Sequence, residues 1–557
     1  MHLLKTLALT ALPFLSVALR SSGNAPAEDL LAPTMSTMNV AIIGAGAGGA
    51  STAYHLAQLA KEEGISINIT VFERESYIGG RSTTVNAWDD PYVPIELGAS
   101  IFVEVNHILN NASKEFGLEI KDHDEDTMLN DSTPDLGVWD GQRFVVITAE
   151  EDGWWEKAKL LWRYGLAPIK TNRLMKSTVG KFLKMYDEPI FPWKSLSDAA
   201  EEVGLREATG VTGEQFLRAN GIGEAFSNEI IQASTRVNYA QNLPLIHGLE
   251  TMVCMAAEGA MAIKGGNWRI FSAMLKRSGA DIRLNTTVNE ISKQGDGTYI
   301  LTADAGVKSS AQSFDSIILA APYQFSAIDI NPSPRSTPDE IPYVELHVTL
   351  FASPHRLDPA AFNLKPDDKV PQFVITTLPP GEQHGSDPDG VGSPGFFSIS
   401  VVGRGLNPNS SPTNRPEYIY KIFSAKPVDS RFLTRVLGHK VPDDEVDPSG
   451  AVTWIIHKIW HPYPYEYPRV TFEDTKLDDN LWYTSGIESF ISTMETSALS
   501  GKNVAKLIID EWIKGNSKTA RLPKTGEAGE KMGVQEQPEW EFAGLKDEEQ
   551  KPIKAKL

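Results

Sequence analysis

The sequence contains a single cysteine, Cys254, in 557 residues. One cysteine cannot make a disulfide within the chain, and a chain of this length can bury a core large enough to fold without one, even in an oxidising compartment. Cys254 lies in the apolar run 252–257, so we interpret it as a small buried apolar residue. A free thiol, a covalent cofactor tether and an intermolecular bridge are the functional alternatives.

Positive charge is also scarce. The chain has 52 Lys and Arg against 72 Asp and Glu, a formal net charge of −20 and a sequence pI near 5.1. This balance disfavours a phosphate-backbone partner, and we expect no nucleic-acid function. Beyond residue 17 no apolar run reaches the roughly 20 residues that span a bilayer, so we expect no transmembrane segment and only transient contact with lipid.

Residues 1–18 have the pattern of a secretory signal peptide. A short basic stretch (1–5) precedes an apolar run (6–17), and Ser16-Val17-Ala18 offers a small-residue cleavage site. An uncleaved anchor is the alternative, although the run is short and Pro13 interrupts it. We therefore expect a protein of the secretory pathway, either secreted or in a lysosome or vacuole, with residues 19–37 as a linker. Glycosylation sequons compatible with this route stand at Asn111, Asn130, Asn285 and Asn409, whereas that at Asn68 falls in a predicted strand.

A dinucleotide-binding turn is the most informative motif. Residues 39–43 form a short apolar strand that runs into Gly44-x-Gly46-x-x-Gly49 and a predicted helix over 50–59. The first glycine permits the tight turn, the second lets the backbone approach a pyrophosphate, and the third allows strand and helix to pack closely. The helix N-terminus offers N–H groups and a positive dipole end to the phosphates. A second strand, 67–72, ends in Glu73, where a carboxylate accepts hydrogen bonds from the adenosine ribose.

The residues after Glu73 indicate which dinucleotide is bound. Glu73-Arg74, followed by Gly-Gly-Arg-Ser at 79–82, resembles the FAD-binding segment of the amine oxidase and phytoene desaturase flavoproteins. In that group the glycines bring backbone up to the cofactor and the arginine lies by the pyrophosphate, which matches Gly80 and Arg81. A guanidinium meets phosphate oxygens with paired donors, as lysine cannot. An ordinary surface turn is the alternative.

A second cofactor segment is expected near the C-terminus. Residues 481–498 pass from a strand through a loop to a helix that runs through residue 508. Ser492 and Glu495 form a capping-box pattern at the helix start. The positive end of such a helix can face the pyrimidine edge of a flavin, where negative charge gathers on reduction. Glu488 would then accept hydrogen bonds from the ribityl chain. An ordinary capped surface helix is the alternative.

The whole chain indicates an α/β fold, in which a Rossmann-like FAD-binding domain is interleaved with a mixed α+β substrate domain, as in the two-domain amine oxidase architecture. We assign residues 38–105, 250–335 and 476–515 to the FAD-binding domain, 106–249 and 336–475 to the substrate domain, and 516–557 to a disordered tail. Residues 105–250 are predicted mostly helical. Strands are expected within 344–351, 395–402 and 451–457.

Several segments together resemble the prenylcysteine oxidase (prenylcysteine lyase) family between residues 39 and 510. They are 95–101 with 106–107, 264–267, 420–424, 460–465 and 485–498. The resemblance implies a noncovalent FAD enzyme that uses O₂ to cleave the thioether of farnesyl- or geranylgeranyl-cysteine, giving cysteine, a prenyl aldehyde and H₂O₂. It also implies an apolar pocket in which Gly98, Ala99 and Ser100 pack beside the flavin. The low cysteine content and the Pro/Asp/Gly-rich stretch 379–394 depart from the family pattern.

These motifs define a candidate site without metal ligands. His107 and His461 are the catalytic candidates, because histidine titrates in a useful range, although an isolated histidine is more often a structural residue. Contacts to FAD are predicted for Gly44, Gly46, Ala47, Gly48, Gly49, Glu73, Arg74, Gly80, Arg81, Gly98, Ala99, Ser100, Val288, Gly486, Glu488, Met494 and Glu495.

Two other functions stay open at this point. One is another FAD-dependent oxidase of the amine oxidase or desaturase type, acting on a small apolar metabolite. The other is a secreted flavoprotein or lipid-binding protein without turnover, because a fold alone does not establish catalysis.

Overall fold

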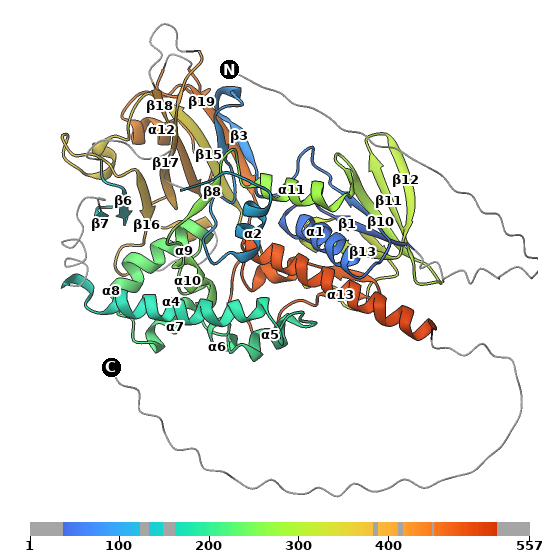
Figure 1. Cartoon of the computed structure of the whole chain (residues 1–557). Helices are drawn as coiled ribbons and strands as arrows, with labels where there is room; N and C mark the ends of the chain where they lie inside the picture. The colour runs from blue at the N-terminus through green and yellow to red at the C-terminus, as the bar shows by residue number, and fades with distance from the viewer. Residues whose placement is uncertain are drawn as a thin grey trace, which may run out of the picture. The chain divides into compact units, whose positions relative to one another are not determined.

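The computed structural model describes residues 37–122, 133–148, 162–382, 388–409, 416–447 and 450–520 (Figure 1). The predicted signal peptide, residues 19–36 of the predicted linker and the sequon at Asn130 lie outside these ranges. Residues up to Asp510 form one compact unit, and the chain from Glu511 onward belongs to a second. In the described ranges no helix combines the length and apolarity needed to cross a bilayer.

The predicted Rossmann-like fold is confirmed by a six-stranded sheet. Its strand order is β20-β21-β13-β1-β2-β9, with every pair parallel except β20 and β21. The five parallel strands, numbered along the chain, give the 3-2-1-4-5 order of a doubly wound sheet. The mostly buried, apolar strands β1, β13 and β21 suit a sheet that is covered on both faces. The strands are β1 (Met38–Ile43), β2 (Ile67–Phe72), β9 (Asp281–Arg283), β13 (Ser316–Leu319), β20 (Lys476–Asp478) and β21 (Leu481–Tyr483).

Helices α1 (Ala47–Glu62), α11 (Trp268–Ser278) and α13 (Met494–Ala520) accompany this sheet (Figure 1). Helix α1 packs directly on α13, where the Ser51 hydroxyl donates to the Ala498 carbonyl at 2.6 Å. A Cβ on Gly501 would lie 2.3 Å from the Gly48 carbonyl oxygen, so this close approach of two backbones requires glycine. Helix α13 continues through residues 516–520, which the composition had assigned to the disordered tail; residues 521–557 lie outside the described ranges.

A four-stranded sheet in the order β12-β11-β10-β14 extends the core of the Rossmann-like part. Buried residues of both sheets, such as Phe72, Ile291 and Leu319, form one hydrophobic cluster. The strands are β10 (Thr287–Lys293), β11 (Tyr299–Ala305), β12 (Lys308–Phe314) and β14 (Asp329–Asn331). Predicted FAD contact Val288 is buried in β10.

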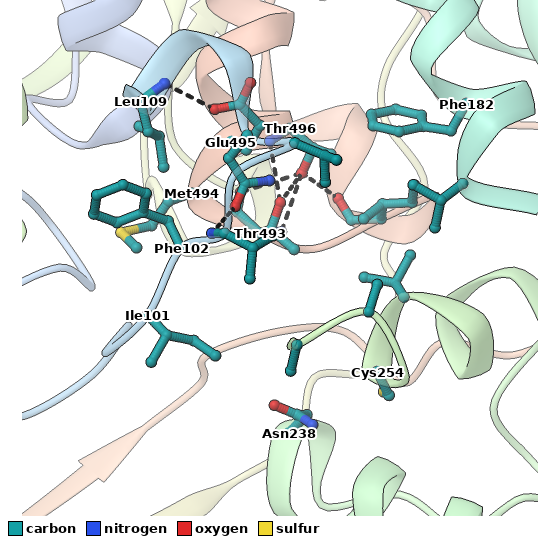
Figure 2. Close-up of a pocket in the computed structure, with 18 of the residues that line it drawn as sticks. Ile101, Phe102, Leu109, Phe182, Asn238, Cys254, Thr493, Met494, Glu495 and Thr496 are labelled. Carbon is teal, nitrogen blue, oxygen red and sulfur yellow. Dashed lines mark hydrogen bonds between the residues drawn. The ribbon is translucent and has the colours of Figure 1, made fainter. Parts of the chain in front are cut away.

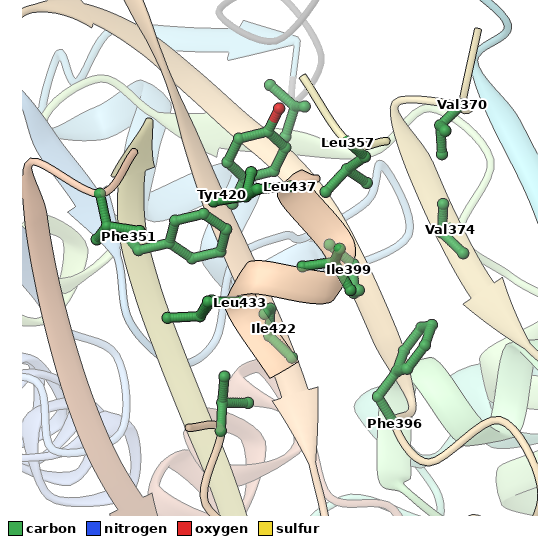
Figure 3. Packing of buried hydrophobic residues seen from close by; sticks show 14 of the residues in the cluster. Phe351, Leu357, Val370, Val374, Phe396, Ile399, Tyr420, Ile422, Leu433 and Leu437 are labelled. Atoms are coloured by element: carbon green, nitrogen blue, oxygen red, sulfur yellow. The ribbon is translucent and has the colours of Figure 1, made fainter. Parts of the chain in front are cut away.

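A seven-stranded sheet, β19-β15-β18-β17-β16-β6-β7, carries the second large core. Helix α12 (Ser430–Leu437) packs on it through Leu433 and Leu437, which lie against Ile399 and Ile422 of the sheet (Figure 3). The strands are β6 (Leu136–Trp139), β7 (Phe144–Thr148), β15 (Leu346–Ser353), β16 (Phe373–Thr376), β17 (Ser398–Leu406), β18 (Pro416–Ser424) and β19 (Trp454–Trp460). Strands β6 and β7 fall inside the region predicted to be mostly helical. Strand β6 pairs with β16 from far along the chain, and β7, which is rich in β-branched residues, pairs with β6 at the edge of the sheet.

Short helices fill most of the rest of that region. They are α2 (His107–Glu115), α4 (Ala167–Leu183), α5 (Leu196–Glu202), α6 (Arg206–Thr209), α7 (Gly213–Ala219), α8 (Glu224–Phe226), α9 (Gln232–Tyr239) and α10 (Gly248–Cys254). Two small sheets, β3 (Thr84–Asn86) with β4 (Pro94–Glu96) and β5 (Ile120–Asp122) with β8 (Met261–Ile263), connect them to the Rossmann-like part. The division into a cofactor domain and a substrate domain stays a prediction.

Two carboxyl groups are buried beside the start of α10. His247 caps this helix, since its Nδ1 accepts the Glu250 amide at 3.0 Å, and its Nε2 lies 3.6 Å from Glu466. Burial raises the pKa of Glu250 to about 8. Burial, followed by repulsion from Glu250, raises the pKa of Glu466 well above its ordinary value. Both carboxyls therefore favour the protonated form in the folded chain.

This burial predicts a stability that falls as pH rises. In the unfolded chain Glu250 ionises near its ordinary pKa of 4.5, so folding takes up a proton between that value and about 8. The contribution of Glu250 to the free energy of unfolding is therefore fully present below the unfolded-state pKa. It decreases as the pH rises towards the folded-state pKa, by up to about 1.4 kcal/mol per pH unit for each proton taken up. Glu250→Gln should flatten the decrease between pH 6.5 and 8 by up to this amount, measured by chemical denaturation. The exposed Glu258→Gln is the control, and an unchanged slope in Glu250→Gln would contradict the prediction.

Candidate functional site

The glycine turn lies where the strand order of the Rossmann-like sheet reverses. Gly44 directly follows β1 and has a φ of 109°, and a Cβ there would lie 2.7 Å from the Ala320 carbonyl oxygen just beyond β13. Gly46 is the N-cap of α1 and provides no side chain to cover the first amides of the helix. Doubly wound folds bind ligands in the crevice at such a switch point, beside a helix N-terminus.

Glu73 points back at this turn from the end of β2. Its buried carboxylate accepts the Ala45 amide at 2.8 Å and the Glu75 amide at 2.9 Å. Each oxygen keeps further lone pairs that can accept ribose hydroxyls. Arg74, by contrast, is exposed, and its guanidinium donates to the Phe325 carbonyl at 3.1 Å.

The two predicted glycine segments meet backbone to backbone. A Cβ on Gly80, which has a φ of 59°, would lie 3.3 Å from the Cα of Gly46. A Cβ on Gly98 would lie 1.9 Å from the Arg81 carbonyl oxygen, and the Ala99 amide donates to the same oxygen at 3.2 Å. Segments 44–49, 79–82 and 96–100 therefore lie next to one another, with glycines at the points where their backbones approach most closely.

Arg81, which is partly exposed, forms an ion pair with the buried Glu488. Two parallel hydrogen bonds of 2.6 and 2.8 Å join the guanidinium to the carboxylate, and the Tyr343 hydroxyl donates to the same carboxylate at 3.1 Å. Arg81 also donates to the Pro462 carbonyl. The sequence predicts that Arg81 contacts the pyrophosphate and Glu488 the ribityl chain of FAD. In the structure the two side chains contact each other. Their contacts to FAD stay predictions, as does that of Gly486, which lies buried two residues before Glu488.

The predicted capping box at the start of α13 is wrong. The hydroxyl oxygen of Thr493, not that of Ser492, accepts an amide of the first turn, from Thr496 at 3.1 Å. The Glu495 carboxylate turns to another helix and accepts the amides of Ile108 and Leu109, at 2.8 and 3.0 Å. Asn106, the N-cap of α2, provides no side-chain cap, so Glu495 satisfies these buried amides in its place.

Glu495 also accepts the Tyr186 hydroxyl at 2.8 Å, and burial raises the pKa of this carboxyl to about 7. The neighbouring residue, Met494, receives a hydrogen bond from the Ser82 hydroxyl at 3.0 Å on its sulfur. The start of α13 is thus fixed to the segment 79–82 on one side and to α2 on the other. Sequence spacing carries no sign of these contacts, because Glu495 and Ile108 are 387 positions apart.

A pocket of about 880 Å³, counted to its open mouth, lies against the start of α13. Figure 2 shows Phe102 and Met494 on one side of it and Cys254 on the other. Apolar side chains dominate its wall, and they come from four helices, the segment after Ser100 and the loop before α13: Ile101, Phe102, Leu109, Val179, Phe182, Leu183, Leu249, Val253, Ile491 and Met494. Tyr239 and Asn238 are among its few polar residues.

The two catalytic candidates do not meet. His107 is exposed at the start of α2, where its ring lies against Tyr186 with the centroids 5.2 Å apart. His461 lies beside Phe325, 4.0 Å from a Glu345 carboxylate oxygen, and about half of its side chain is exposed. Neither side chain is part of the pocket wall as described. Their catalytic roles stay predictions.

Sequence reasoning missed Lys421, a buried lysine of β18. Its ammonium donates to the Glu96 carbonyl at 3.0 Å, to the Gly98 carbonyl at 3.4 Å and to the Ser100 hydroxyl at 3.1 Å. Burial lowers the pKa of Lys421 to about 8. The lysine attaches the segment expected beside the flavin to the seven-stranded sheet. In the sequence, a single lysine within the apolar run Tyr-Ile-Tyr-Lys-Ile-Phe could have indicated that this lysine is buried.

Comparisons with known proteins agree with this geometry. The family model described as prenylcysteine lyase matches residues 147–520, and that of the NAD(P)-binding Rossmann-like domain matches residues 42–114. Farnesylcysteine lyase of Arabidopsis thaliana is 27% identical over 496 residues, which cover 86% of this chain and 89% of the relative. Prenylcysteine oxidase 1 of Homo sapiens is 25% identical over 496 residues, which cover 85% of this chain and 89% of the relative.

Solved structures share the fold at much lower identity. A redesigned putrescine oxidase superposes with a TM-score of 0.51 at 13% identity, covering 85% of this chain and 99% of its own. Cyclohexylamine oxidase from Brevibacterium oxydans IH-35A gives a TM-score of 0.50 at 15% identity, with the same coverage. These confirm the amine oxidase-like architecture. Since the prenylcysteine lyase model matches well over half of the residues, the chain belongs to the prenylcysteine lyase family.

Proposed function

We propose that this protein is an FAD-dependent oxidase of the secretory pathway, secreted or in a lysosome or vacuole, that cleaves the thioether of farnesyl- or geranylgeranyl-cysteine. Prenylcysteine, O₂ and water would give cysteine, a prenyl aldehyde and H₂O₂. The observation that carries the proposal is the apolar pocket, whose wall includes Met494 and Ile101 from the two segments expected to hold the flavin. The names of the relatives support the same substrate class.

The residues present fit FAD. Gly46 and Gly80 leave a backbone-lined surface that a side chain would fill. The uncovered start of α1 offers amides to the pyrophosphate, and Glu73 offers free lone pairs to a ribose. The paired Arg81 and Glu488 would lie between pyrophosphate and ribityl chain, with residues 98–100 and the start of α13 along the ring. The segments 38–105, 250–335 and 476–515 would thus form the cofactor domain.

The pocket fits an isoprenoid chain. Its wall is mostly apolar and is built from segments far apart in the sequence, as is usual for small-ligand sites. Leu109, Phe182 and Leu249 offer apolar contact without directed hydrogen bonds, as a hydrocarbon requires. The charged amino and carboxylate groups of the substrate would stay near the open mouth of the pocket, since an unpaired charge in an apolar environment is costly.

The protein's contribution to the chemistry is mainly positioning. FAD, when bound, supplies the hydride acceptor for carbon 1 of the prenyl group, which is allylic and next to sulfur. The pocket wall would hold that carbon in place and keep bulk water away. The Tyr239 hydroxyl donates to the Ser492 carbonyl at 3.0 Å, which fixes the loop before α13. Little acid or base catalysis is required of His107 or His461.

Direct turnover tests the proposal. Purified protein should bleach its flavin absorbance when farnesylcysteine is added without oxygen, and should release H₂O₂ and a prenyl aldehyde in air. Peroxide formed from amines or polyenes but not from farnesylcysteine would favour the other oxidase class. A flavoprotein inert to all of them would indicate a binding role.

Val253→Asp should separate substrate binding from cofactor binding. Val253 lines the pocket, so a carboxylate there would face the hydrocarbon chain and lose its hydration. We expect kcat/KM for farnesylcysteine to fall at least about 100-fold, equivalent to about 2.7 kcal/mol, with the flavin content unchanged. Val253→Leu, which keeps the wall apolar, should retain most activity. Equal activity of the two variants would mean that the prenyl chain lies elsewhere.

Glu73→Gln should weaken FAD binding. The substitution keeps the shape but removes the charge-assisted hydrogen bonds to the ribose, which costs about 1.5–3 kcal/mol, or roughly 10- to 150-fold in Kd. Titration of the apoprotein with FAD measures the effect. Glu75→Gln is the matched control because its side chain is about half exposed. Unchanged FAD affinity in Glu73→Gln would show that the ribose lies elsewhere.

FAD should be released intact when the protein unfolds. Cys254 lines the pocket, yet burial raises the pKa of its thiol well above the ordinary value, which keeps it protonated and a poor nucleophile for a flavin tether. Acid or guanidinium denaturation followed by filtration should leave no flavin absorbance on the chain. Yellow colour that stays with the unfolded protein would contradict this expectation.

A further inference from the structure

One helix differs in charge from the rest of this acidic chain. Residues 162–186 contain six Lys and Arg and no Asp or Glu, although the whole chain has a formal net charge of −20. Most of this segment is helix α4, and Arg163, just before it, is paired with Glu229 at 2.7 Å. Five positive charges therefore remain on α4 and the residue after it: Lys170, Arg173, Lys176, Lys181 and Lys184.

These charges share the outer face of the helix with large apolar residues. At about 100° per residue, Leu166, Ile169, Arg173 and the other basic residues fall within one half of the helix circumference. Leu166 is 62% exposed and Ile169 is 43% exposed, and Trp162, four residues before Leu166, is 92% exposed. We call the side chains of Trp162, Leu166, Ile169, Lys170, Arg173, Lys176, Lys181 and Lys184 the α4 outer face.

The opposite face of α4 belongs to the protein interior. Ala167, Thr171, Thr178 and Phe182 are buried there, and Phe182 lines the apolar pocket together with Val179 and Leu183. The same helix thus forms a wall of the pocket and presents the outer face to solvent. A partner bound to the outer face would be separated from the pocket by the thickness of α4, roughly 10 Å.

The combination of residues points to a lipid surface. Aromatic and aliphatic side chains that stand beside lysines and arginines, without acids, are typical of helices that lie in the membrane interface. The long basic side chains can reach lipid phosphates while their methylene stems lie along the acyl boundary. Each Lys or Arg near an anionic bilayer contributes about 1 kcal/mol. The negative charge of the rest of the chain would keep other faces away from such a surface.

We propose that the α4 outer face docks on an anionic lipid bilayer, so that the adjacent pocket takes its prenyl thioether from the membrane in which such a molecule dissolves. The docking surface stands on the charges and exposed side chains of α4. The delivery of substrate rests in addition on the proposed function.

Vesicle binding tests the docking surface directly. The full chain should co-sediment with vesicles of phosphatidylcholine containing about a third phosphatidylserine, should bind pure phosphatidylcholine vesicles far more weakly, and should be released by high salt. Replacing Arg173, Lys176 and Lys184 by Gln should lower partitioning about 100-fold, since each charge is worth about a factor of five.

A matched control carries the same change of net charge elsewhere. Lys276, Lys308 and Lys365 are also exposed, and their joint replacement by Gln should leave partitioning within about twofold of wild type. Trp162→Ser with Leu166→Ser should also weaken binding, without changing net charge. Unfolding midpoints close to wild type in each variant show that folding is intact, because none of these side chains is buried.

Three outcomes would overturn the proposal. They are wild-type protein that ignores anionic vesicles, equal binding to neutral and anionic vesicles, and equal loss in the α4 variant and in the control. Self-association that the α4 substitutions abolish, in protein that does not bind vesicles, would assign the face to a second copy of the chain.

A turnover assay separates this proposal from the proposed function. The α4 charge variant should oxidise farnesylcysteine in free solution as fast as wild type and lose about tenfold or more in rate when the substrate is held in anionic vesicles. Wild-type protein that binds vesicles but oxidises neither form would contradict the proposed function and leave the docking surface intact. Equal rates of variant and wild type on both forms would overturn delivery from the membrane.

Discussion

The buried carboxylate of Glu495 is the contact on which the arrangement of the site depends. It accepts the first amides of α2 and the hydroxyl of Tyr186, and its own backbone starts α13. Three parts of the chain, near residues 108, 186 and 495, are therefore fixed at one point. The apolar pocket is the space that these parts enclose with α4 and α10. Because a buried carboxylate without donors is costly, this point cannot open without a large loss of stability.

The Rossmann-like part and the helices around the pocket differ in what they indicate about function. The structural likeness to amine oxidases extends over 85% of the chain at 13–15% identity, so it reflects a shared fold and carries no information about the substrate. The pocket wall comes largely from α2, α4, α9 and α10, within residues 106–257, and most of it lies in the region that the prenylcysteine lyase model matches. In the proposed function, the helical region would therefore contact the substrate, whereas the Rossmann-like sheet would hold the cofactor.

The sequence was most informative where the contacts are local. The strand at 38–43, the glycines, the helix and Glu73 lie within 36 residues, and backbone geometry dictates their order, so they could be predicted together. Glu495 shows the limit. Its spacing from Ser492 satisfied a local rule, yet buried amides at the start of α2 offered stronger partners, and tertiary structure overrode the capping box. Two other contacts could not be predicted from sequence either, because each joins segments more than 300 residues apart. They are the contact of Arg81 with Glu488 and that of Lys421 with residues 96–100.

The close crossing of α1 and α13 at Gly48 and Gly501 has a consequence for biosynthesis. The first strand, the glycine turn and α1 emerge from the ribosome at the beginning of translation, whereas β21 and α13 emerge only near its end. The cofactor cleft therefore stays incomplete through most of translation, and the nascent chain has to keep its N-terminal strand available until residue 501 arrives. If α13 contacts the flavin as proposed, complete binding of the cofactor would have to wait until translation of this helix is finished.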